Sequence, residues 1–279
     1  MKQTPRALGL SGVGSILTRN ARDNLDLWIR ILAPPPRVSM FRPHLPAMAA
    51  TVATLVAVVA SMFLLDAAAS DWARHEPSWF RAAFEKITNF GLGGWFLIPF
   101  GFIVLCLAAI KSPKLPPLTQ GVLAALAVRF GFLFLAVGVP GLFVTIVKRL
   151  IGRARPYVGS YDDPFAYMPF IWRSEYASMP SGHATNAAAA AIAIGAIWPS
   201  TRGVMWVYAI IIMLSRVFVL AHHPSDVVAG ALVGVAGACL VRRWFAGRRL
   251  LFCARDLRAY PGPSLRRIRA AIGEAIVAL

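Results

Sequence analysis

Long uncharged apolar runs alternate with short polar joints along most of this chain. The runs occupy residues 45–65, 87–110, 118–147, 184–201, 203–221 and 227–241. A helix needs roughly 20 consecutive, mostly apolar residues to cross the hydrocarbon core of a bilayer. The pattern therefore predicts six transmembrane helices, and the predicted fold class is an all-α integral membrane protein.

Composition excludes a soluble or a disordered chain. Hydrophobic residues make up 58% of the sequence and charged residues 15%, whereas a soluble domain has about 45–50% and about 25%. A soluble fold could not bury this much apolar surface, and a disordered chain would be poorer in apolar residues. Charge inside a membrane is costly and marks functional sites. We therefore expect Arg216 and Asp226 to be functional, and Arg129 to extend to the cytoplasmic interface.

The net charge of +17 comes mainly from the two ends of the chain. Residues 1–45 carry seven Lys and Arg against two acidic residues, and residues 242–279 carry nine Arg against two. Basic segments beside apolar spans are typical of cytoplasmic tails on an anionic leaflet. Nucleic acid is not an expected partner, because no nucleic-acid-reading motif accompanies the charge.

These observations predict three regions. Residues 1–44 form a basic cytoplasmic tail, in which 24–33 have the pattern of an amphipathic helix lying on the membrane surface. Residues 45–246 form the six-span domain, and 247–279 form a second basic cytoplasmic tail.

Counting the spans predicts which joints face outward. Six crossings put both tails on the cytoplasmic side, so the joints at 148–182 and 222–226 face the extracytoplasmic side. The first of these joints is itself rich in basic residues, which breaks the orientation rule locally. Its basic residues are Lys148, Arg149, Arg153, Arg155 and Arg173. We interpret Arg153 and Arg173 as solvated loop charges, and the excess of cations still requires an explanation.

Cations and a helix start come together at these outward-facing span ends. Lys148 and Arg155 are seven residues apart and share a face if their helix continues, and Arg216 adds a third cation from another span. Ser181 and Gly182 open a helix, whose free N–H groups and positive dipole end attract anions. Arg side chains suit phosphate oxygens. The predicted phosphate-binding residues are Lys148, Arg155, Ser181, Gly182 and Arg216.

Two histidines and a carboxylate could carry out chemistry on a bound phosphate. Asp226 lies four residues after His222, so its carboxylate can fix the tautomer of that imidazole and raise the nucleophilicity of the other ring nitrogen. His183 is available as an acid for a leaving oxygen. The same three residues could in principle bind Zn²⁺, but the surrounding cations oppose a metal. The predicted chemistry is covalent phosphoryl transfer through His222, with no metal.

The three stretches resemble the signature of the type 2 phosphatidic acid phosphatases, the PAP2 superfamily. In order, they are Lys148-x6-Arg155-Pro156, Pro180-Ser181-Gly182-His183 and Ser215-Arg216-x5-His222-x3-Asp226. The resemblance implies that His222 becomes a phosphohistidine, that Asp226 orients it and that His183 is the general acid. It also implies no cofactor. His223 is an adjacent rival, but the spacing from Arg216 and to Asp226 selects His222.

The resemblance implies a metal-independent, acid-phosphatase-like lipid phosphatase of a bacterial inner membrane. Its active site would lie in a helical bundle at the extracytoplasmic, periplasmic face. Relatives act on undecaprenyl diphosphate, phosphatidylglycerol phosphate, phosphatidic acid or the phosphates of lipid A, and we favour polyprenyl diphosphate or another envelope lipid. The expected partners are a phosphorylated lipid and the bilayer, with no obligate protein partner. Two alternatives stay open: a non-hydrolytic binder or transporter of phosphorylated lipid, and a phosphatase for a soluble ester.

Overall fold

The computed structural model describes residues 10–32, 45–111, 114–158 and 163–278, and its regular elements within these ranges are helices joined by loops. The helices are α1 (Leu10–Leu32), α2 (Leu45–Leu64), α3 (Asp66–His75), α4 (Ser78–Thr88), α5 (Gly94–Ile110), α6 (Pro117–Ile151), α7 (Gly182–Ile197), α8 (Arg202–Phe218), α9 (Pro224–Gly247) and α10 (Leu265–Val277). The described residues contain isolated bridges but no strand. The predicted all-α class is thus confirmed.

Each of the six apolar runs coincides with a helix, but the helices are not equally suited to cross a membrane. Among the described residues, four segments are long and apolar enough, namely Ser78–Ile110, Pro117–Ile151, Pro199–Phe218 and Pro224–Gly247. A fifth candidate is Met48–Leu64 together with Asp66–His75, which are bent by 54° at their junction. α7 has only 16 residues, about 24 Å at 1.5 Å per residue.

α7 lies at the centre of the bundle, where it packs against α6, α8 and α9. Most of its buried residues are alanine, which allows neighbouring backbones to approach closely. Two glycines of α9 exploit this approach. A Cβ at Gly230 would lie 2.4 Å from the Ser181 carbonyl oxygen, and a Cβ at Gly234 would lie 2.3 Å from that of Thr185. The Thr185 hydroxyl also donates to the Gly230 carbonyl at 2.9 Å.

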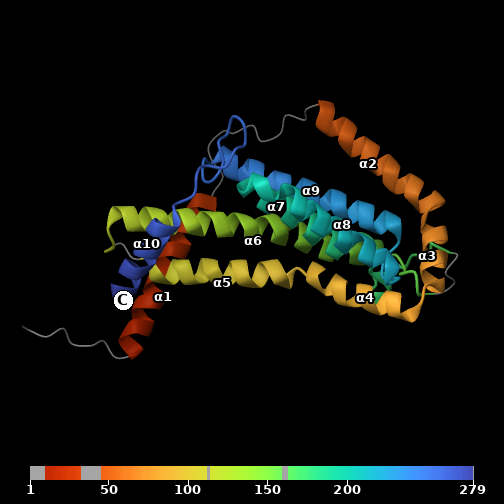
Figure 1. Ribbon diagram of the computed structural model, residues 1–279, viewed down its shortest axis with the longest axis horizontal. Helices are drawn as coiled ribbons and strands as arrows, with labels where there is room; N and C mark the ends of the chain where they lie inside the picture. The colour runs from red at the N-terminus through yellow and green to blue at the C-terminus, as the bar shows by residue number, and fades with distance from the viewer. Residues whose placement is uncertain (1–9, 33–44, 112–113, 159–162, 279) are drawn as a thin grey trace, which may run out of the picture.

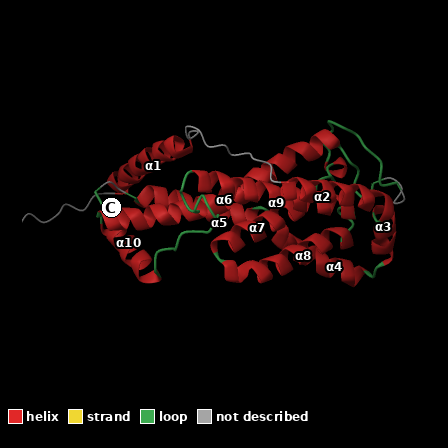
Figure 2. Ribbon diagram, turned by 90° about the horizontal axis from the view of Figure 1, so that it is seen from above, coloured by secondary structure: helices red, strands yellow, loops and turns green. Residues whose placement is uncertain are grey.

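The long helices run side by side, and the two ends of the bundle differ (Figures 1 and 2). α3 and α4 lie at one end, and α1 and α10 lie at the other. The loops that precede α7 and α9 are at the α3 end. Many large apolar side chains on the outside are exposed, among them Ile98 and Leu142, as expected of helices that face lipid rather than water.

The basic ends of the chain pack on the bundle. Asn20 and Asn24 of α1 donate to carbonyl groups at the end of α5, including Ala109 at 3.2 Å and Lys111 at 2.9 Å. α1 is longer than the predicted surface helix, whose last position, residue 33, lies outside the described residues. At the other terminus, α10 packs on α6, and Thr119 donates to Glu274.

The environment of Arg129 differs from the one that the sequence predicted. Arg129 does not extend to an aqueous interface but is 9% exposed. Its Nη2 donates to the carbonyl groups of Tyr260 and Pro261, both at 2.8 Å. The charge therefore ties the segment between α9 and α10 to the middle of α6.

Candidate active site

The predicted site residues meet at the α3 end of the bundle. His183, in the first turn of α7, interacts electrostatically with Lys148, Arg155, Arg216 and His222. These residues come from α6 and the following loop, α8, and the joint between α8 and α9. Three pieces of chain that are distant in sequence therefore share one small volume.

Lys148 and Arg155 come together by a route that the sequence reasoning did not foresee. The helix does not continue to Arg155, because α6 ends at Ile151 and its C-cap, Gly152, has a left-handed φ of 64°. A Cβ there would lie 1.9 Å from the Met168 carbonyl oxygen, so the tight turn requires glycine. Arg155 lies in the loop, where its backbone N–H donates to the Glu175 carbonyl at 2.9 Å. The two cations nevertheless interact electrostatically.

The spacing between Arg216 and His222 is fixed by the way α8 ends. Leu220 has a φ of 55°, which reverses the chain direction. The backbone N–H groups of Ala221 and His222 then both donate to the Arg216 carbonyl at 3.1 Å, a common arrangement at helix C-termini. This turn holds the imidazole beside the helix end that carries the guanidinium.

Several buried donors of the site have no hydrogen-bond partner within the described chain. They are Nε of Arg155, Nε of Arg216 and the Ser181 hydroxyl. Arg216 is 7% exposed and uses Nη1 to donate to the Thr88 hydroxyl at 2.6 Å. A Cβ built on Gly182 meets nothing within 4 Å, so the start of α7 faces open space. Unpaired buried donors are expensive, and an anion at this position would satisfy them.

His222 is 4% exposed, and its surroundings distinguish its two ring nitrogens. Nδ1 lies 3.5 Å from the Ser178 hydroxyl and 3.7 Å from Oδ2 of Asp226, so Nε2 is the nitrogen that could attack. Burial lowers the pKa of His222 to about 4; Asp226 opposes this lowering, and Arg216 and Arg155 add to it. The imidazole is therefore neutral at pH 7, as a nucleophile must be.

The carboxylate of Asp226 is fully buried and has more partners than His222. Oδ2 accepts from the Ser178 hydroxyl at 2.5 Å and from the backbone N–H of His223 at 2.9 Å. Oδ1 accepts from Nη1 of Arg153 at 2.6 Å. Asp226 thus joins the imidazole to the loop before α7 and to the start of α9.

Comparison with known proteins identifies the family of this chain. The PAP2 superfamily profile matches residues 129–250. The lipid A 1-phosphatase of Rhizobium johnstonii is 34% identical over 212 residues, which cover 75% of this chain and 85% of the relative. The chain belongs to the PAP2 superfamily. It is accordingly an enzyme that hydrolyses phosphate esters, and the resemblance found in the sequence is confirmed.

Two further similarities complete the comparison. The lipid A 1-phosphatase of Rhizobium etli is 33% identical over 201 residues, covering 71% of this PAP2 chain and 85% of the relative. A solved PAP2-type phosphatidylglycerolphosphate phosphatase from Bacillus subtilis is 21% identical, with a TM-score of 0.49, over 72% of this chain and 96% of that one.

The position of Arg153 is the main difference between the structure and what the sequence predicted around the candidate site. Arg153 is fully buried, not a solvated loop charge. Its guanidinium pairs with Asp226 at 2.6 Å and Asp66 at 2.8 Å, and donates to the Ser225 hydroxyl at 2.7 Å. Burial alone would lower the pKa of Arg153, but Asp226 and Asp66 outweigh it and raise that pKa.

Asp66 and Ser178 are the residues that sequence reasoning missed. Asp66 opens α3 and accepts from the backbone N–H of Ser225 at 3.0 Å, so it bonds to both Arg153 and the start of α9. One signal could have found it, because it directly follows the first apolar run and, by span counting, lies at an outer end. No comparable signal marked Ser178.

His223 has a different environment from His222. It is 2% exposed, and its Nδ1 lies 3.1 Å from the Ser70 hydroxyl of α3. His223 is also the N-cap residue of α9 and forms a capping box with Asp226. Its contacts are those of a helix cap. Among the described residues, no group of three or more His, Cys, Asp or Glu side chains is arranged to hold a metal ion.

Proposed function

We propose that this PAP2 enzyme removes the 1-phosphate of lipid A by way of a phosphohistidine on His222. The proposed substrate comes from the two relatives, both named lipid A 1-phosphatase. It narrows the earlier expectation of polyprenyl diphosphate or another envelope lipid, which rested on the family resemblance. The observation that carries the proposal is the neutral, buried His222 beside guanidinium groups with unpaired N–H donors.

The proposed first step transfers the phosphoryl group to the enzyme. Burial and the neighbouring cations lower the pKa of His183 to about 3, so His183 takes up its proton only when the phosphate dianion binds and offsets those cations. Nε2 of His222 then attacks phosphorus, the bond from phosphorus to the lipid oxygen breaks, and the protonated His183 supplies the proton that this oxygen needs. Asp226 stabilises the positive charge that develops on the imidazole. In the second step a water oxygen attacks phosphorus, the nitrogen–phosphorus bond breaks, and His183 takes up the proton of the water. The products are the dephosphorylated lipid and inorganic phosphate.

The proposed phosphate cage consists of Lys148, Arg155, Ser181, Gly182 and Arg216. Guanidinium forks and the N–H groups at the start of α7 would hold the equatorial oxygens while charge moves from phosphorus to the leaving oxygen. The Arg216 guanidinium is held by Thr88 before substrate arrives, and the backbone that carries Arg155 is held by the Glu175 carbonyl. Preorganised donors of this kind stabilise a transition state without reorganising during the reaction.

The proposed topology is six crossings of a bacterial inner membrane, with both termini cytoplasmic and the site facing the periplasm. Its domain comprises residues 45–246, between a basic N-terminal tail (1–44) and a basic C-terminal tail (247–279). The arginine-rich α10 at the end opposite the site supports it. A reporter that works only in the cytoplasm should be active when it is fused after residue 279, and one that works only in the periplasm should be inactive there. The opposite result would put the site on the cytoplasmic side and contradict a periplasmic substrate.

Release of phosphate from defined lipids tests the reaction and the nucleophile together. The full-length protein in detergent with EDTA receives lipid A, undecaprenyl diphosphate, phosphatidylglycerol phosphate, phosphatidic acid and a soluble phosphate ester. We expect lipid A to be the best substrate and His222→Ala to lose turnover by about 10⁴-fold or more. His75→Ala is the matched control, since His75 lies on α3 and its side chain is 69% exposed.

The outcomes of this experiment are separable. Wild-type turnover in His222→Ala would remove His222 as the nucleophile, whichever lipid is used. A clear preference for another lipid would overturn lipid A as substrate while leaving the phosphohistidine route intact. Trapping of ³²P on the wild type but not on His222→Ala would support the covalent step directly.

A further inference from the structure

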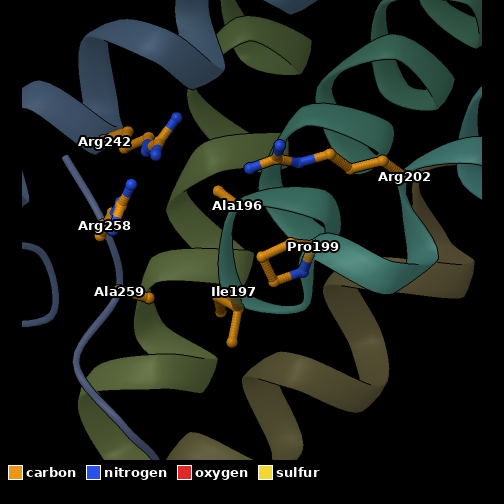
Figure 3. A pocket seen from close by; sticks show the side chains of 7 residues that line it. All are labelled: Ala196, Ile197, Pro199, Arg202, Arg242, Arg258 and Ala259. Atoms are coloured by element: carbon orange, nitrogen blue, oxygen red, sulfur yellow. The ribbon is translucent and has the colours of Figure 1, made fainter. Parts of the chain in front are cut away.

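A cavity at the end of the bundle opposite the active site gathers three arginines from three elements. Its volume is about 350 Å³, and it is lined by Arg202 at the start of α8, Arg242 near the end of α9 and Arg258 in the segment before α10. Such a volume lies at the lower end of the range of ligand pockets, about 300–1,000 Å³. Figure 3 shows the guanidinium groups of Arg202 and Arg242 pointing toward one another, with Arg258 beside Arg242.

The arginines are held by neutral groups, so their charges stay largely uncompensated. Nε of Arg202 donates to the Gly195 carbonyl at 3.0 Å, and Nη2 of Arg242 donates to the Leu257 carbonyl. Arg242 also stacks on Phe252 at 5.2 Å. The acidic neighbour is Asp256, 3.5 Å from Nε of Arg258. Three cations and one half-exposed carboxylate leave a net positive cavity, which favours an anion.

Two details indicate that the cavity is organised to bind. Nε of Arg242 is buried and has no hydrogen-bond partner within the described chain, although its guanidinium is held in place by Leu257 and Phe252. Arg202 occupies the first position of α8, where the helix dipole disfavours a cation. A Cβ at Gly195 would lie 2.8 Å from Cγ of Arg202, so a glycine leaves room for this side chain. An anion between the arginines would relieve both costs.

The remaining walls and the position of the cavity indicate the class of anion. Its other lining residues, Ala196, Ile197, Pro199 and Ala259, are apolar. The cavity lies where α7 ends and α8 begins, beside Trp198, which is 43% exposed. Tryptophans and arginines at the ends of apolar helices are typical of the membrane interface. Basic pockets between membrane helices bind phospholipid head groups.

From this arrangement we propose that Arg202, Arg242 and Arg258 form a second, non-catalytic site for a phosphate group, which the head group of an anionic membrane phospholipid supplies. The phosphate accepts from the three guanidinium groups, and the adjoining glycerol and acyl carbons contact the apolar wall. The site stands apart from the proposed catalytic residues and does not depend on the identity of the enzyme's substrate.

The test compares two exposed arginines on the full-length protein. Arg258→Gln removes a cavity residue whose side chain is 84% exposed, so the variant should fold. Arg243→Gln is the matched control, because Arg243 is an exposed neighbour of Arg242 outside the cavity lining. Arg202→Gln serves as a second cavity variant. Each protein is placed in neutral phosphatidylcholine nanodiscs with and without phosphatidylglycerol, and the retained phosphatidylglycerol is counted by native mass spectrometry.

A second arm titrates inorganic phosphate into the same proteins in detergent and follows the thermal midpoint. The active site also binds phosphate, so only differences between cavity variants and the control are counted. We expect Arg258→Gln and Arg202→Gln to weaken phosphatidylglycerol retention about tenfold, since each removes a charge-assisted hydrogen bond, and Arg243→Gln to resemble the wild type.

A cavity-dependent effect in the lipid arm supports the head group as the source. An effect with inorganic phosphate alone overturns the lipid source and retains a site for a soluble phosphate. Equal behaviour of cavity variants and control in both arms overturns the site altogether.

Discussion

The two ends of the bundle hold buried arginines in opposite ways. At the end that carries the candidate active site, Arg153 is fully buried and pairs with two carboxylates, Asp66 at 2.8 Å and Asp226 at 2.6 Å. At the other end, Arg129 bonds to main-chain carbonyls, including Tyr260 and Pro261 at 2.8 Å. Carboxylates neutralise a guanidinium and fix its position, whereas carbonyls fix the position and leave the charge.

This difference matches what each end is proposed to do. Asp226 is proposed to orient an imidazole, so its carboxylate must be held, and Arg153 holds it by joining α3, the loop before α7 and α9. At the opposite end the arginines tie chain segments to the bundle and keep a positive potential. The contrast predicts that loss of an arginine disturbs chemistry at one end and local packing at the other.

Replacing Arg153 should have the largest effect. Arg153→Gln leaves Asp66 and Asp226 as neighbouring buried carboxylates without their cation, and breaking such a pair costs about 3–5 kcal/mol. In the protein that still folds, a misplaced Asp226 should lower kcat by about 100-fold with less change in KM. Turnover of lipid A and thermal unfolding in detergent measure the two effects, with the exposed Arg173 as control, replaced by Gln.

Arg129→Gln is the matched variant at the opposite end. It removes hydrogen bonds from a charged donor, each worth about 1.5–3 kcal/mol, so the thermal midpoint should fall while kcat stays near the wild-type value. If Arg129→Gln lost kcat as strongly as Arg153→Gln, the two ends would be coupled and the contrast would fail. If Arg153→Gln kept full kcat, Arg153 would have only a structural role.

Which candidate site residues lie together could be predicted from the sequence where local spacing determines the geometry. The residues from Arg216 to His222 form the C-terminal turn of α8, with Leu220 in the left-handed conformation. The residues from His222 to Asp226 include the start of α9. The roles of Arg153 and Asp66 could not be predicted in this way. They depend on a turn at Gly152 that folds the loop back and on a bend that brings α3 against α9, both long-range features.

The apolar pattern predicted the helices well, but it was less informative about which of these helices cross the membrane. All six runs are mostly helical, because long uncharged apolar runs favour helices in a membrane. The run at 184–201 gives a helix that ends at Ile197, and most residues of this helix are buried by its neighbours. An alanine-rich helix has an apolar sequence whether lipid or protein surrounds it. Hydropathy therefore does not distinguish a helix at the periphery of the bundle from one at its centre.

The smallest predicted effect concerns pH and again separates the two ends. The pKa of His222 falls from its ordinary value of 6.5 to about 4, chiefly through burial. Between these values the unfolded chain binds a proton that the folded protein excludes, so stability is complete above pH 6.5 and declines as the pH falls toward 4. At 1.36 kcal/mol per pKa unit the loss is about 3 kcal/mol.

Unfolding in detergent at pH 7, 6, 5 and 4.5 can isolate this contribution. Wild type and His75→Ala should lose stability together, whereas His222→Ala should lose less, with the gap widening toward pH 4. Arg129→Gln should run parallel to the wild type, because the described histidines, His75, His183, His222 and His223, belong to α3, the start of α7 and the joint between α8 and α9, at the end away from Arg129. Parallel curves for wild type and His222→Ala would mean that the folded protein accepts a proton at His222, and the neutral buried nucleophile would have to be abandoned.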